Sequence, residues 1–83
     1  MRYQHETIEY YIKDALVEID KALKGCENKT LEDGELLPLM EHALHMFNAA
    51  FNLRYISRDK ISKMSQTEWE KYLEPPEEIF RDK

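Results

Sequence analysis

Glycine, cysteine and proline are scarce in this sequence, and long apolar runs are missing. Its 83 residues include two Gly, three Pro and the single Cys26. This scarcity excludes collagen-like and low-complexity chains, and one cysteine cannot form an internal disulfide. No apolar run approaches the roughly 20 residues of a membrane-spanning helix. Charged and polar residues around His5 stand where a secretion signal needs an apolar stretch. We therefore expect a cytoplasmic protein that does not contact membranes.

Basic residues are outnumbered, with twelve Lys and Arg against seventeen Asp and Glu and a net charge of −5. A nucleic-acid-binding domain normally shows a basic footprint, so we do not expect a nucleic-acid partner. Residues 54–63 still form a basic patch that contains Arg54, Arg58, Lys60 and Lys63. Acidic segments flank this patch and favour its neutralisation by neighbours. Binding of a small anion or a phosphate backbone is the alternative.

A long amphipathic helix is predicted over residues 4–24. Its apolar residues recur at spacings of four and three, which is the period of a buried helix face. They are Ile8, Ile12, Ala15, Ile19 and Ala22. Gly25 follows as the expected left-handed stop, and residues 25–35 are predicted to form a polar loop.

A second long helix is predicted over residues 36–56, with Pro38 tolerated in its first turn. Its apolar residues cover an arc of roughly 200°, whereas a surface helix buries an arc of about 100° or somewhat more. They are Leu36, Leu37, Leu39, Met40, Ala43, Leu44, Met46, Phe47, Ala50, Phe51 and Leu53. One neighbouring helix cannot cover such an arc, so this helix needs cover from two or three sides.

A short third helix is predicted over residues 66–73. Ser65 and Glu68 stand at the spacing of a capping box, and two prolines stop the helix. A tail over residues 74–83 follows, in which Ile79 and Phe80 could add one more turn. The whole chain, residues 1–83, is therefore predicted to be one all-α domain: a long antiparallel helical hairpin with a short third helix, dimerising into a helical bundle.

Two histidines offer a candidate metal site. His42 and His45 lie three residues apart, and Glu41 lies four residues before His45. Two imidazoles at this spacing can share a metal ion, and a dimer would double the ligand set. The Glu-x-x-His and His-Glu-x-x-His motifs are absent from the sequence. A hydrogen-bonded interface role and ordinary solvated histidines are the alternatives.

The polar side of the second helix carries little charge. From Pro38 to Leu53 the only formal charge is Glu41, while Asn and His occupy the rest of that side. Such groups tolerate burial when they are hydrogen-bonded, so this side is expected to meet another subunit or a ligand. The predicted interface residues are Asn48, Asn52, Phe47, Phe51, Trp69 and Tyr72.

No residue set predicts catalysis or a cofactor. Cys26 lies in an acidic loop that does not activate a thiol, and the two glycines cannot form a phosphate-binding loop. We therefore expect a non-enzymatic interaction module, either a homodimer or a binder of another protein. The alternative function is a small metal-binding or catalytic protein that uses His42, His45 and Glu41.

Overall fold

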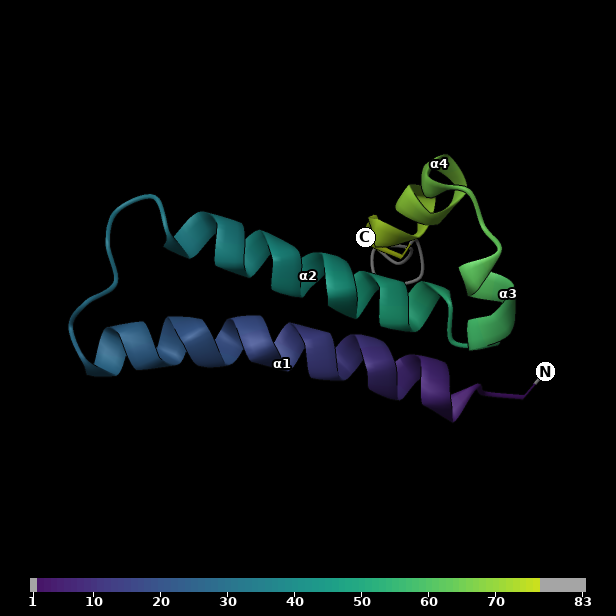
Figure 1. Ribbon diagram of the computed structural model, residues 1–83, viewed down its shortest axis with the longest axis horizontal. Coiled ribbons are helices and arrows are strands. Elements are labelled where there is room, and N and C mark those ends of the chain that lie inside the picture. The colour runs from purple at the N-terminus through teal and green to yellow at the C-terminus, as the bar shows by residue number, and fades with distance from the viewer. Residues whose placement is uncertain (1, 77–83) are drawn as a thin grey trace, which may run out of the picture.

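Two long antiparallel helices, joined by a loop at one end, form the frame of the protein (Figure 1). The computed structural model describes residues 2–76. Helix α1 spans His5–Glu27 and helix α2 spans Leu36–Asn52. Three short elements follow: α3 (Arg58–Ser62), α4 (Gln66–Glu70) and the 3-10 helix η1 (Lys71–Leu73). The predicted all-α helical hairpin is thus confirmed.

The first helix continues past its expected end. Gly25 stays helical, and the positive φ of 56° falls instead at Lys29. A Cβ at Gly25 would lie 3.1 Å from the Cβ of Leu31, so the absence of a side chain lets Leu31 pack against the helix end. Close packing, rather than a left-handed stop, explains this glycine.

The second helix begins where the proline allows and ends earlier than expected. Pro38 lies in the first turn of α2, where a missing N–H costs nothing. After Asn52 the chain turns, and α3 starts anew with Ser57 as its N-cap, accepting a hydrogen bond from the Lys60 N–H at 3.3 Å. Neither this break nor α3 is predicted by the sequence pattern.

The predicted capping box is present at the start of α4. Ser65 Oγ accepts from the Glu68 N–H at 3.1 Å, and the Glu68 carboxylate accepts from the Ser65 N–H at 3.3 Å. The expected third helix is divided into α4 and the tighter η1. The predicted turn of Ile79 and Phe80 lies outside the described residues.

The core lies where α1 and α2 meet the C-terminal helices. Alanines on both long helices keep the side chains between them small, and half-buried Trp69 and Tyr72 pack against this core. Its buried apolar members are Tyr11, Ala15, Ala43, Met46, Ala49, Ala50, Leu53 and Ile61. The core therefore occupies only the end of the hairpin that α3, α4 and η1 cover.

The buried face of α1 is rotated from the predicted one. Fully buried Thr7 donates a hydrogen bond from Oγ1 to the Ile56 carbonyl at 2.7 Å, and Tyr11 is 3% exposed. Ile12 and Ile19, which were expected to face the partner helix, keep 36% and 40% of their surface exposed. Helix α1 thus carries apolar residues on two adjacent faces, of which α2 covers one.

Candidate interaction surface

Each long helix carries a stripe of large apolar side chains that the protomer leaves exposed. We call the two stripes together the bare face. Their exposed fractions range from 36% to 68%. The members are Ile12, Leu16, Ile19 and Leu23 on α1, and Leu36, Leu37, Met40, Leu44, Phe47 and Phe51 on α2. Phe47 and Phe51 are therefore available for the interface predicted for them.

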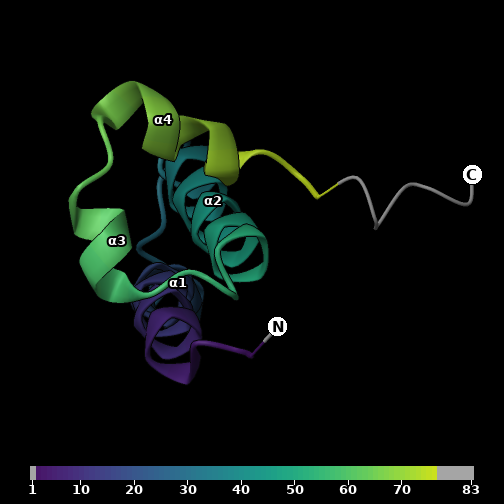
Figure 2. The ribbon, with the colours of Figure 1, turned by 90° about the vertical axis from the view of Figure 1, so that its right-hand side faces the viewer.

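The two stripes lie on the same side of the hairpin. On α1 the buried Tyr11 is followed by the exposed Ile12, and on α2 the buried Ala43 is followed by the exposed Leu44. One residue turns the direction of a side chain by about 100°. Because the helices are antiparallel, this same step turns both stripes toward one side. Figure 2 shows α3 on one side of the hairpin with α4 above α2. Residues of α3 and α4 line a pocket together with Tyr10, Asp14 and His42, and no residue of either stripe lines that pocket.

A groove between the two helices joins the stripes. Its volume is about 260 Å³, and Ile19 from α1 lines it together with Met40, Leu44 and Phe47 from α2. Among residues 2–76, Glu18 is the one charged residue that lines it. An apolar groove of this kind fits a side chain from another apolar surface better than it fits a polar ligand.

The asparagine side of α2 is covered by the chain itself. Asn48 is 6% exposed and donates to the Leu73 carbonyl at 2.9 Å. Asn52 donates to the carbonyls of Tyr72 and Glu74 at 2.8 and 2.9 Å. These contacts give both amides hydrogen-bond partners within the chain, and their predicted role in an interface stays a prediction. The C-terminal segment supplies the hydrogen bonds that explain the low charge of this side of α2.

Trp69 and Tyr72 also make their contacts within the protomer. The indole Nε1 of Trp69 donates to the hydroxyl of Tyr11 at 2.9 Å and so links α4 to α1. Tyr72 lies half-buried in η1. Both side chains act as anchors of the C-terminal helices, whereas their predicted role in an interface stays a prediction.

The two candidate metal-binding histidines are not gathered into a ligand set. His42 Nε2 lies 3.5 Å from Asp14 Oδ2, with both side chains partly exposed, while His45 and Glu41 are exposed. Among residues 2–76, no three His, Cys, Asp or Glu side chains are grouped so that they could hold a metal ion. The sequence does not predict the role of Asp14, because its pairing with His42 depends on how α1 and α2 are aligned.

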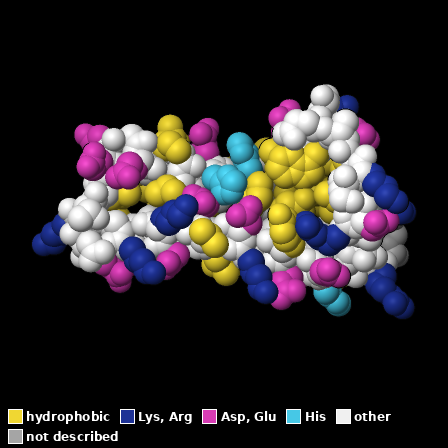
Figure 3. Space-filling model, viewed as in Figure 1, with side chains coloured by type: hydrophobic (Ala, Val, Ile, Leu, Met, Phe, Trp, Pro, Cys, Tyr) yellow, Lys and Arg dark blue, Asp and Glu magenta, His cyan; other side chains and the backbone are white. Residues whose placement is uncertain are grey.

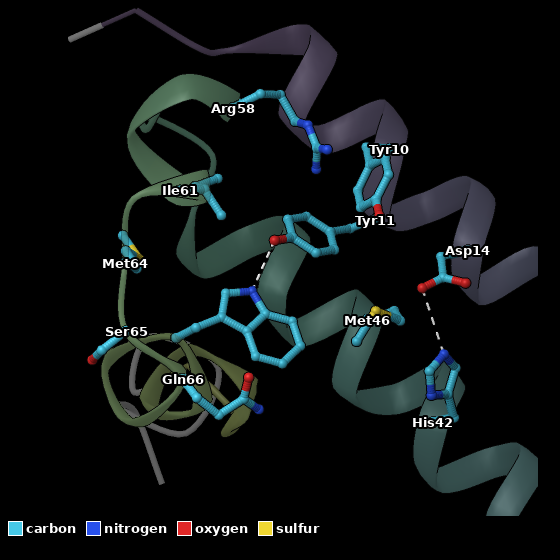
Figure 4. Close-up of a pocket in the computed structure, with 11 residues that line it drawn as sticks. Tyr10, Tyr11, Asp14, His42, Met46, Arg58, Ile61, Met64, Ser65 and Gln66 are labelled. Carbon is cyan, nitrogen blue, oxygen red and sulfur yellow. Dashed lines mark hydrogen bonds and ion pairs between the residues drawn. The ribbon is translucent and has the colours of Figure 1, made fainter.

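The His42–Asp14 pair lies at one edge of an open pocket of about 400 Å³ (Figure 4). The guanidinium of Arg58 lies 3.5 Å from the centre of the Tyr10 ring, and Trp69 lines the same pocket. On the face that carries α3 and α4, histidine side chains gather beside the apolar ones under α4 (Figure 3). The pocket thus mixes aromatic rings with both signs of charge.

The predicted anion-binding cations make varied local contacts. Arg54 donates to the Phe51 carbonyl at 2.6 Å and lies 3.8 Å from the centre of the Phe51 ring. Lys63 pairs with Asp59 at 3.3 Å, and Lys60 lies exposed in the last turn of α3. Anion binding by these residues stays a prediction.

No known protein family, curated protein or solved structure matches this chain. None of the helices within residues 2–76 has the length and apolar character that crossing a bilayer requires. The interpretation of the site therefore depends on its own geometry.

Proposed function

We propose that this protein is a non-enzymatic interaction module that associates through the bare face. The observation that carries this proposal is the continuity of ten exposed apolar side chains on one side of the hairpin. Monomeric soluble proteins rarely expose a contiguous apolar patch beyond about 300–600 Å². A protein surface placed over these side chains would remove them from water, which is the main favourable term in association.

The internal bonds of Asn48 and Asn52 support this choice of surface. The sequence offered two candidate sides of α2 for a partner, and the chain itself covers the asparagine side. The side that contains Phe47 and Phe51 stays exposed. The proposed interface is therefore moved from the asparagines to the bare face and gains a contribution from α1.

The substitution Leu44→Glu tests this function. Leu44 is 54% exposed, so a carboxylate there is solvated in the protomer but would be desolvated in a complex. We expect Leu44→Glu to keep its helical circular dichroism and to lose association at micromolar concentration. Light scattering detects assembly of the pure protein, and co-purification from its source cells detects another partner.

The matched control is Val17→Glu. Val17 is a 51% exposed apolar residue of α1 that lies outside the bare face. This variant should associate as the wild type does. The proposal is wrong if the wild type neither self-associates nor co-purifies with a protein, or if Leu44→Glu associates unchanged.

A further inference from the structure

We propose that the partner of the bare face is a second copy of this chain, docked face to face around a two-fold axis that lies in the plane of the contact, runs across the two helices and passes over the groove. Two hairpins then form a four-helix bundle. This inference rests on the proposed function, because it names the occupant of the same surface.

The area of the bare face fits a stable dimer. Ten large side chains that are about half exposed amount to roughly 700 Å², close to the about 800 Å² that each partner contributes to a standard interface. A single inserted side chain or a small molecule would leave most of this area in water.

Residues 77–83 are too few to supply the cover. Residues 77–83 contain two large apolar side chains, Ile79 and Phe80. The α2 stripe alone runs from Leu36 to Phe51, about 22 Å along the helix at 1.5 Å per residue. Two side chains cannot cover ten that are spread over this length on two helices.

The spacing of the apolar side chains on the bare face fits the same face of a second copy of the chain. On α1 the stripe follows spacings of four, three and four residues, and on α2 it follows four, four, three and four from Leu36. These are the spacings of a bundle seam. A partner that offers two such stripes, separated by the same inter-helix distance, is the same hairpin.

The charged residues beside the α1 stripe do not repel a second copy of the chain strongly. Glu9 pairs with Lys13 at 3.1 Å, and Asp20 pairs with Lys24 at 3.0 Å, each one turn apart along α1. Each acid is thus accompanied by a base on the same helix, which weakens like-charge repulsion between two identical faces. A strongly charged partner would find no complementary field on this side of α1.

The position of the groove indicates where the two-fold axis of the proposed dimer lies. Ile19 and Leu44 line it and belong to the middle part of their stripes. A two-fold axis through this point places every part of one bare face beneath the other, whereas a displaced axis leaves one end exposed. In such an isologous contact the residues beside the axis approach their own counterparts, and those at the ends do not.

Single cysteines in a Cys26→Ser background test this arrangement with a short bismaleimide cross-linker. Leu44→Cys should yield mostly cross-linked dimer at micromolar protein. Leu37→Cys belongs to the bare face but lies seven residues away, about 10 Å along α2. Its two copies are then roughly 20 Å apart, so it should stay below one tenth of the Leu44→Cys yield, as should Val17→Cys.

Light scattering of the pure wild-type protein completes the test. A dimer that Leu44→Glu dissociates supports the inference. A monomer that nevertheless binds another protein through Leu44 overturns the inference and leaves the proposed function standing. A dimer that Leu44→Glu does not disturb overturns both.

Two further results would also overturn the inference. Cross-linking of Leu37→Cys at the level of Leu44→Cys would place the axis elsewhere. A monomeric wild type that dimerises once Ile79 and Phe80 are both changed to Ser would identify the C-terminal tail as the occupant.

Discussion

The side-chain amide of Asn48 donates a hydrogen bond that joins α2 to η1. The side chain is 6% exposed, and its amide nitrogen lies 2.9 Å from the Leu73 carbonyl oxygen that accepts its hydrogen. Asn48→Ala leaves this carbonyl without its partner, which costs about 1–3 kcal/mol. Urea unfolding followed by circular dichroism should show this loss.

Gln66→Ala is the matched control for Asn48→Ala. Gln66 is exposed and donates to Glu70 one turn away. Its removal should change the free energy of unfolding by less than about 0.5 kcal/mol. Equal effects of the two substitutions would contradict the structural role given to Asn48.

The sequence predicted that Asn48 and Asn52 meet another subunit or a ligand, and it did not predict the carbonyls of the chain's own C-terminal segment that accept their hydrogen bonds. A helix side with Glu41 as its one formal charge is typical of a covered surface, and this part of the prediction depends on composition alone. The acceptors lie 20 to 25 residues further along the chain. These backbone carbonyls can accept the asparagine hydrogen bonds because η1 is short and ends before Glu74.

Among the elements, α4 shows the largest contribution from local sequence. It has five residues, and its capping box acts together with the packing of half-buried Trp69 to hold it in place. Ser65→Ala removes the acceptor for the Glu68 N–H and should cost about 1 kcal/mol. Urea unfolding measures this cost.

Ser62→Ala serves as the comparison for Ser65→Ala. Ser62 lies exposed in the last turn of α3 and donates to the Asp59 carbonyl, so it caps no helix start. Its effect should stay within about 0.5 kcal/mol. The role of the capping box is refuted if Ser65→Ala is no more destabilising than Ser62→Ala.

The prediction of elements succeeded where the signals are local. The capping box, the proline in the first turn of α2 and the two long periodic segments all act within a few residues. The division of the second helix at Asn52 could not be predicted in this way. The division depends on Thr7. Its hydroxyl donates to the carbonyl of Ile56, 49 residues away, and so holds the turn after Asn52 against α1.

At the scale of the whole molecule, the thermal midpoint should depend on protein concentration. Association stabilises the folded state by mass action. For a homodimer of this size, each tenfold increase in concentration should raise the midpoint by about 3–5 °C. Scanning calorimetry over two decades of concentration measures this shift.

The same scans on Leu44→Glu give the reference for a dissociated protomer. Its midpoint should be lower than that of the wild type and independent of concentration, because Leu44 is already half exposed in the protomer. A wild-type midpoint that does not move with concentration would contradict self-association.

The unusual width of the apolar arc on α2 was evident from the sequence, whereas its division among neighbours was not. Helix α1 covers one part, the C-terminal helices cover another, and the stripe from Leu36 to Phe51 stays exposed. The stripe on α1 was also missed, because Ile12 and Ile19 belong to a periodic pattern that fits two neighbouring faces equally well.

Trp69 can serve as an intrinsic fluorescence probe, because its indole is hydrogen-bonded to Tyr11. Trp69 is the single tryptophan of the chain, and it lines the pocket beside α3 and α4, which shares no lining residue with the groove of the bare face. Its fluorescence should therefore report whether α4 stays attached to α1, and it should be insensitive to the separation of the two protomers of the proposed dimer. Emission from this one indole can thus distinguish detachment of the C-terminal helices from dissociation without any added label.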